Sequence, residues 1–424
     1  MRTAGRAADE QGVAVRPWTT STWRRAAAVS VTVVCLWYAP IAMTELWSYA
    51  RPGAPAPGEW LLGQLVSPRY VADALATRVA PYRHSLIPMI VHSVLGGLLM
   101  LLGPAQLLTA ARRRIRLHRA LGVLFAVTVY ASMAGAGLYL ARTAPEDAFS
   151  GTAFWIVLAT ILVGTVLSVT FGILAAVGGF PDLHQRWLLL CYGYLLTAPL
   201  LRIEWGALPA VLPGLPMTEI NRVAIMHLGS LVVFGALLAS RARDRRDTVE
   251  GLGRSWAPLP VTVGAHLAGA AALVWIVRAL SLYGAAGRRL LAGYLIPYAV
   301  AYAVMALGAR RAGRAGRPWA REEWRIQLVG LCLAPVLSAG AVAVLEHSLR
   351  LGRFTALTSG VAVGCGTTAF AATLVVSLRL MHAREVTRRA LPAPPATPRA
   401  TAPVTCPVPG AGGQQCRVRS EPGR

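Results

Sequence analysis

The chain has 424 residues, of which 55% are hydrophobic and only 14% are charged, and its mean hydropathy is +0.52. Soluble domains usually carry about 25% charged residues, so this composition excludes an ordinary water-soluble enzyme. The formal charge is +24, and because the sequence contains no lysine, the basic side chains are all arginine or histidine. Schiff-base lysine chemistry and a lysine-dependent phosphate-binding loop are therefore excluded.

About ten apolar runs are long enough to cross a membrane as helices, since a span needs about 20 apolar residues. Their apolar character is continuous and lacks the alternation of a barrel strand. We therefore predict an all-α, polytopic transmembrane helical bundle of about ten spans. In chain order the runs are Ala26–Leu46, Leu86–Leu108, His118–Ala141, Ala153–Val177, His184–Trp205, Val223–Ser240, Leu259–Leu282, Leu290–Leu307, Ile326–Leu345 and Thr355–Leu380.

These runs predict seven segments. They are a cytoplasmic N-terminal tail (1–25), a first transmembrane helix (26–48), an external link (49–85), a five-helix core (86–240), a basic cytoplasmic link (241–258), a four-helix accessory bundle (259–380) and a disordered cytoplasmic tail (381–424). The first apolar run is full-length, which favours an uncleaved anchor over a secretory signal. The last segment is rich in Pro, Ala and Arg, a composition typical of disorder.

Arginine placement predicts the orientation of the helices. Three arginine-rich links fall on one side of a ten-span bundle, and the positive-inside rule makes that side cytoplasmic, together with both termini. The links are Arg112–Arg119, Arg241–Arg254 and Arg310–Arg325. We therefore predict a multi-pass protein of a bacterial plasma membrane that attracts anionic headgroups. Because no nucleic-acid-binding module is recognisable, we expect no nucleic-acid partner.

The cysteines and carboxylates of the predicted spans give little indication of chemistry inside the membrane. No CxxC or Cys/His cluster occurs, so neither a disulfide framework nor a zinc site is predicted. The cysteines in the spans are interpreted as small apolar fillers: Cys35, Cys191, Cys332 and Cys365. The carboxylates Glu45, Glu204 and Glu346 fall near predicted outer ends, and a proton- or sodium-coupled carrier is disfavoured for that reason.

Four histidines lie within the predicted spans at two depths. His92 and His227 lie roughly 10 Å from the outer ends of their spans, at about 1.5 Å per residue, whereas His118 and His184 begin spans at the opposite end. Imidazoles paired across facing helices are the axial ligands of b-type haem, so the pattern predicts two haems, with haem iron as the metal. The alternative is that each histidine makes one interhelical hydrogen bond or lies at the membrane interface.

Glycines near the outer histidines have two interpretations. They would leave space for a flat macrocycle, or they would let two membrane helices approach closely. These glycines are Gly96, Gly97, Gly135 and Gly137.

Five further residues are candidates for contacts with lipid, an anion or another polar group: Gln106, Arg119, Arg186, Trp187 and Arg202. Arginines at the predicted cytoplasmic boundary, such as Arg119 and Arg186, commonly extend to headgroups. For Gln106 we favour a hydrogen bond to a neighbouring helix, and for Arg202 an ion pair with Glu204. Tryptophans near span ends, Trp187, Trp205 and Trp319 among them, are interpreted as an aromatic belt.

Four short motifs lie between Leu86 and Ser240: His92-Ser-Val-Leu-Gly96, Gly103-Pro-Ala-Gln106, Leu117-His-Arg-Ala-Leu-Gly122, and His184-Gln-Arg-Trp187 with the later Leu201-Arg202. Together they resemble a family of predicted bacterial membrane proteins known as domain of unknown function 2306. The resemblance implies a helical core with positioned His, Gln and Arg side chains, and it implies no reaction. Family members often carry a second basic residue after the last motif, where this chain has Leu188–Leu190.

The sequence leaves three functional hypotheses open, and no catalytic motif is recognisable. The first is transmembrane electron transfer through haem b, with a redox partner or quinone. The second is a non-enzymatic protein that binds or transports a lipid or solute, with Arg119 and Arg186 lining an inner rim for anionic groups. The third is a structural subunit of a membrane complex.

Overall fold

The fold was analysed in a computed structural model of the chain. The structure describes residues 19–51, 53–68, 70–73, 82–108, 113–241 and 255–390. The predicted N-terminal tail up to residue 18, most of the predicted basic link (242–254) and the tail from residue 391 lie outside the described residues.

Helices make up the fold, and no strand occurs in the described part of the chain. The long helices are α1 (Thr19–Thr44), α5 (Leu86–Leu107), α7 (Ile115–Arg142), α8 (Thr152–Val177), α9 (Pro181–Val211), α10 (Met217–Arg241), α11 (Leu259–Ser281), α12 (Gly284–Arg314), α13 (Pro318–His347) and α14 (Arg353–Ala390). Short helices α2 (Trp47–Ala50) and α3 (Pro57–Leu65) follow α1, and a 3-10 turn, η1 (Pro145–Asp147), follows α7. The all-α prediction is confirmed.

Nine helices in the described ranges are long and apolar enough to cross a membrane. The remaining long helix, α9, has 31 residues, but His184, Gln185 and Arg186 interrupt its apolar character at one end and Arg202 and Glu204 at the other. It packs between α8 and α10, so neighbouring helices cover it on two sides. Together these helices agree with a polytopic bundle of about ten spans.

Several helices extend beyond the predicted spans, and in α13 and α14 the added ends are packed. α13 begins at Pro318, a residue suited to the first helical turn, eight positions before the predicted start of that span. α14 continues to Ala390, so the prediction that disorder begins at residue 381 is wrong. Arg379 and Ala383 are buried near this end, and Arg384 forms an ion pair with Asp182 at 3.2 Å.

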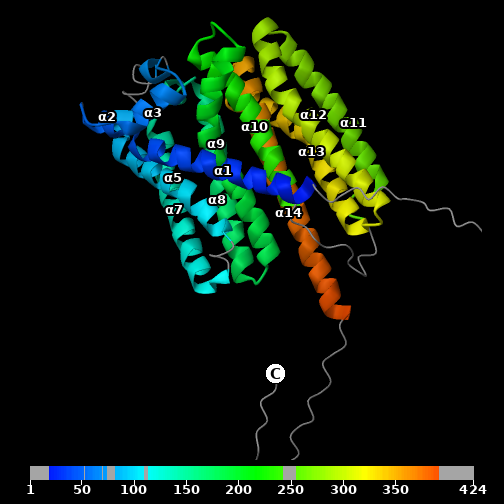
Figure 1. Ribbon diagram of the computed structural model, residues 1–424. Coiled ribbons are helices and arrows are strands. Elements are labelled where there is room, and N and C mark those ends of the chain that lie inside the picture. Colours follow the sequence, from blue (N-terminus) through cyan, green and yellow to red (C-terminus); the bar gives the residue numbers. More distant parts are fainter. Residues whose placement is uncertain are drawn as a thin grey trace, which may run out of the picture.

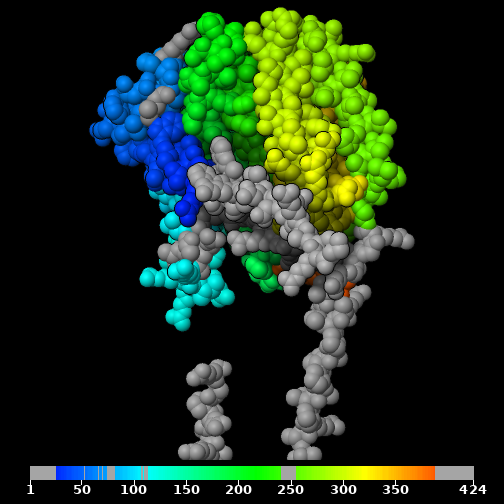
Figure 2. Space-filling view, turned by 45° about the vertical axis from the view of Figure 1, so that its right-hand side comes forward, coloured from blue at the N-terminus to red at the C-terminus, as the bar shows by residue number. Residues whose placement is uncertain are grey.

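The helices are arranged with the C-terminal helix between the two predicted bundles (Figure 1). α5 packs against α1 and α7, and α8 against α7 and α9. α14 contacts α8, α9 and α10 as well as α13, so helices from both ends of the chain share one interior. α1 crosses the front of the bundle obliquely (Figure 1), and in the turned view the green surface of α9 and α10 lies between blue α1 and the yellow-green helices α11 and α12 (Figure 2).

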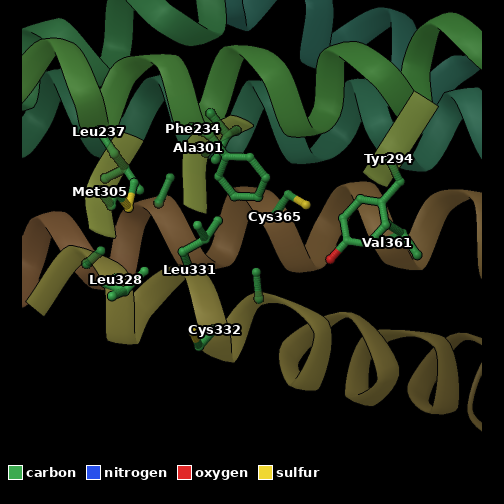
Figure 3. Packing of buried hydrophobic residues seen from close by; sticks show 14 of the residues in the cluster. Phe234, Leu237, Tyr294, Ala301, Met305, Leu328, Leu331, Cys332, Val361 and Cys365 are labelled. Carbon is green, nitrogen blue, oxygen red and sulfur yellow. The ribbon is translucent and has the colours of Figure 1, made fainter. Parts of the chain in front are cut away.

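A continuous apolar core joins α10, α12, α13 and α14. Figure 3 shows Phe234 of α10, Tyr294 of α12, Leu331 of α13 and Cys365 of α14 within this cluster. A second cluster joins α1, α5, α7, α8, α9 and α10. The four cysteines interpreted as apolar fillers are all buried, which agrees with that interpretation: Cys35, Cys191, Cys332 and Cys365.

Tryptophans near span ends do not all form a belt. Trp187, Trp205 and Trp319 are 2%, 1% and 3% exposed, so their assignment to an aromatic belt is wrong. Each packs inside the protein because neighbouring helices cover it: Trp187, for example, stacks on Phe171 of α8 with ring centroids 4.9 Å apart and contacts Phe370 of α14.

Glycines near the predicted outer end serve close packing at two positions. A side chain at Gly135 would overlap the carbonyl oxygen of Pro88, and one at Gly97 would overlap α1 at Ala39 and Met43. The packing interpretation is therefore the one that fits these two positions. Around Gly96, by contrast, the structure leaves open space, and this glycine lines a cavity.

Candidate functional site

A cavity of about 210 Å³ lies among α1, α5, α7, α8, α9, α10 and α14, and we call it the outer cavity because it includes the end of the bundle predicted to face outside. Along α8 its lining runs from Phe154 to Thr165, about 16 Å at 1.5 Å per residue. Ala362 and Gly366 of α14 line it as well. A helix outside the predicted core thus contributes to its wall.

Polar groups gather in one part of the outer cavity. Arg202 and Glu45 form an ion pair at 3.4 Å, and their side chains are each only 14% exposed. The Ser93 hydroxyl donates to the backbone oxygen of Ala42 at 2.7 Å and lies 3.4 Å from the Glu45 carboxylate. The rest of the lining is mainly aliphatic and aromatic, so the cavity is amphipathic.

Two aromatic rings hold the Arg202 guanidinium. Its central carbon lies 5.5 Å from the ring centroid of Tyr38 and 5.1 Å from that of Trp205, distances typical of cation–π contacts. Its hydrogen bonds are long, at 3.4 Å to Glu45 and 3.5 Å to the Ala198 carbonyl oxygen. The Nε atom is buried and has no hydrogen-bond partner among the described residues. The guanidinium is therefore fixed in position but weakly satisfied.

A second cavity, of about 270 Å³, lies among α5, α7 and α9, and we call it the inner cavity. Gln106, His118 and His184 all line it, so three residues of the sequence motifs meet there. Gln106 Nε2 donates to the Leu121 carbonyl oxygen at 3.0 Å, so the helix-to-helix hydrogen bond predicted for Gln106 is present. His184 Nδ1 lies 2.8 Å from the Gly172 carbonyl oxygen.

The predicted outer histidine pair does not share a cavity. His92 lines the outer cavity, and its Nδ1 lies 3.0 Å from the Ser132 carbonyl oxygen. His227 is absent from that lining and instead binds Glu204 through its Nδ1, beside Gly293 of α12. This corrects the predicted pairing of Arg202 with Glu204, because side chains two residues apart on a helix do not face each other.

Haem ligation at two levels does not fit this arrangement. A six-coordinate haem b needs one imidazole on each face of the iron within a single cavity. His118 and His184 share one cavity, the inner one. His92 and His227 do not share a cavity. Among the residues that the structure describes, no group of three or more His, Cys, Asp or Glu side chains could hold a metal ion.

Arg186 does not line an inner rim for headgroups. Its Nη1 lies 2.8 Å from Oε1 of Glu323, and these side chains are 7% and 0% exposed. Arg379 of α14 lies 4.0 Å from the other Glu323 oxygen, 3.2 Å from Glu322, and with its guanidinium carbon 3.6 Å from the Trp319 ring centroid. This buried network joins α9 to α13 and α14, and it corrects the expected headgroup contact. Arg119 is exposed, as a contact with lipid headgroups would require.

Several site residues were missed by sequence reasoning. Glu45 lies 157 positions from Arg202, and Glu323 lies 137 positions from Arg186, so no local spacing connects either pair. Glu323 falls within a segment interpreted as a basic link. The sequence signal for Glu323 was a pair of adjacent carboxylates, Glu322 and Glu323, among arginines.

The DUF2306 family, described as predicted membrane protein, matches residues 89–239. The resemblance expected for Leu86–Ser240 is thereby confirmed. The matched DUF2306 segment runs from α5 to α10 and contains His92, Gln106, His118, His184 and Arg202. No curated protein and no solved structure matched the chain. The family description names no activity, so a function for this chain has to be argued from the geometry of the site.

Proposed function

We propose that this chain is a non-enzymatic membrane protein that binds an amphipathic anion in the outer cavity. The anionic group lies against Arg202, and the apolar chain extends between α8, α9, α10 and α14. The observation that supports this proposal most directly is the state of the Arg202 guanidinium. Two aromatic rings hold it in place, its hydrogen bonds are long, and its Nε has no hydrogen-bond partner among the described residues.

Charge and shape both support this ligand class. Arginine presents several N–H donors in a planar fork that matches a carboxylate or phosphate, and an anion would complete donors that the protein leaves weakly bonded. The cavity continues along α8 as an apolar passage, which suits a hydrocarbon chain. A buried arginine at one part of such a passage supports an anionic rather than a neutral amphiphile.

The hypothesis of haem-based electron transfer receives less support. Its outer ligands do not meet in one cavity, as described above, whereas lipid or solute binding needs only the groups that line the outer cavity. The binding hypothesis moves, however, from the predicted arginine rim at the inner end to Arg202, because Arg186 is committed to Glu323.

The experiment is competition binding with the full chain purified in detergent and freed of co-purified lipid. Radiolabelled oleate is the probe, and unlabelled oleate and oleyl alcohol are the competitors, which share a chain and differ in charge. We expect saturable oleate binding and competition at least about 10-fold weaker from the alcohol, since a hydrogen bond to a charged group contributes roughly 1.5–3 kcal/mol. Equal competition by the two molecules contradicts the proposal.

The test variant removes a positive and a negative charge from the cavity together, so that neither charge is left unpaired. Removing Arg202 alone would leave Glu45 buried without its counter-ion, so the test uses the double substitution Glu45→Gln/Arg202→Gln. We expect it to weaken oleate binding by about 10- to 100-fold. Arg353→Gln, which removes the exposed ion pair with Glu346, is the control and leaves binding unchanged. An equal loss in both variants also contradicts the proposal.

A further inference from the structure

The outer and inner cavities lie end to end across the bundle. On α5, Met100 lines the outer cavity and Gly103 lines the inner one, three residues away. On α9, Leu195 lines the outer cavity and Tyr192 the inner one, again three residues away. Three residues of helix rise about 4.5 Å, so less than one helical turn separates the two spaces on both helices.

Tyr192 occupies this boundary. Its ring packs directly on Gly103, where any larger side chain would overlap it. Its hydroxyl group lies 3.0 Å from Cys35 Sγ of α1 and 3.4 Å from the carbonyl oxygen of Met100. One aromatic side chain from α9 therefore reaches across to α5 and α1 at the level where the outer cavity ends.

The hydrogen bonds of the Tyr192 side chain are weak. A hydrogen bond to a cysteine sulfur is weaker than one to oxygen, and the bond to Met100 is long. The glycine at position 103 leaves the ring against backbone rather than against an interlocking side chain. A rotation of the Tyr192 side chain thus breaks only weak hydrogen bonds.

We propose that the two cavities are halves of one translocation path closed by Tyr192, through which the amphipathic anion passes from one membrane face to the other. This inference rests on the proposed function for the nature of the ligand. Arg202 receives the anionic group in the outer half. Polar side chains from Gln106, His118 and His184 line the inner half, so a charged group meets polar partners on both sides of the ring.

The test is a flux assay with the full chain in proteoliposomes. The probe is an alkyl sulfonate with a fluorophore at its chain end, because its permanent charge prevents passage through the bare bilayer. Dithionite added outside bleaches the probe in the outer leaflet, and continued bleaching reports passage from the inner leaflet. We expect wild-type vesicles to bleach the inner pool at least 10-fold faster than protein-free vesicles.

Two substitutions at Tyr192 test its role as the barrier. Tyr192→Ala opens the path and accelerates bleaching at least 10-fold over wild type, while Tyr192→Phe keeps the ring and stays within about threefold of it. Oleate binding by each variant verifies that the outer cavity is folded. If oleate binds and neither wild type nor Tyr192→Ala passes the sulfonate faster than empty vesicles, the translocation path is disproved while the binding function stands.

The reactivity of the Cys35 thiol tests for a continuous path independently of oleate binding. In a chain carrying Cys406→Ser and Cys416→Ser, an anionic methanethiosulfonate is added to one vesicle face at a time. In the Tyr192→Ala background we expect Cys35 to react from both faces, and Cys35→Ala to abolish that reaction. The same result with no oleate binding would overturn the proposed function but support a continuous path, and reaction from one face only would overturn the path.

Discussion

Arginines on α9 show how one residue type serves two purposes. Arg186 has a close carboxylate partner in Glu323 and lies beside the apolar core. Arg202 has a longer ion pair and an unsatisfied Nε in a cavity. We infer that the first stabilises the packing of α9 on α13 and that the second is available to a ligand.

Glu323 is expected to be the most sensitive carboxylate for stability. It is fully buried between Arg186 and Arg379, so Glu323→Gln removes the carboxylate that pairs with Arg186 at 2.8 Å and leaves Glu322 as the partner of Arg379. Breaking such a network costs about 3–5 kcal/mol of unfolding free energy, measured by denaturant titration in mixed micelles. The exposed-pair variant Arg353→Gln should cost less than about 1 kcal/mol. Similar losses in the two variants would contradict the assignment of Glu323 to a buried network.

Residue pairing was the part of the site least accessible from sequence. The hydrogen bond of Gln106 was predictable because its partner Leu121 lies on the next span, 15 positions away. The partners of Arg186 and Arg202 are more than 130 positions away and depend on how the helices assemble. Spacing along one helix suggested Glu204 as the ion-pair partner of Arg202. Such spacing does not reveal partners that lie on other helices.

Close contact between α5 and α7 depends on the absence of a side chain at Gly135. The backbone of α5 at Pro88 and His92 lies against this position, so the two helices approach with no side chain between them. Gly122, on the same helix α7, has open space around it. The two glycines therefore offer a matched comparison within one element.

Alanine substitutions at these two glycines should have opposite effects. Gly135→Ala forces α7 away from α5, and we expect a loss of about 1–3 kcal/mol in unfolding free energy, as for other overpacked interiors. Gly122→Ala should be neutral or stabilising by up to about 1 kcal/mol, because alanine has the better helix propensity. Thermal unfolding of both purified variants checks the difference. Equal midpoints would show that Gly135 does not determine the helix contact.

Hydropathy predicted the existence of the long helices well but their ends poorly. Apolar length identified each long helix, since lipid requires an unbroken apolar surface. The ends of α13 and α14 carry charged side chains that other helices bury, and charge in the sequence was interpreted as a link. α9 was predicted as a span although its polar ends lower its mean hydropathy.

The whole molecule is less divided than the order of its segments suggests. α14 completes the wall of the outer cavity, and Glu323 with Arg379 completes the environment of Arg186. The last helices therefore support the DUF2306 segment directly. Sequence patterns suggested an accessory bundle because the contribution of these helices consists of small residues, such as Gly366, and of charges near span ends.

The arginine-rich links predict which side of the assembled protein faces the cytoplasm. We predict that the α13–α14 connection faces outside and the α12–α13 connection faces the cytoplasm. In a chain with all six native cysteines replaced by serine or alanine, Ser348→Cys should react with a membrane-impermeant maleimide on intact cells. Ala315→Cys should react only after permeabilisation. Both positions are exposed, so a reversed pattern would invert the orientation and the names of the two cavities.

Pro199 gives α9 a mechanical property that bears on the whole assembly. A proline inside a helix removes one backbone hydrogen bond, and bending at that place costs less than elsewhere. The residue lies between Tyr192 and Arg202, so a bend at this place would change the position of the Arg202 guanidinium relative to the Tyr192 ring.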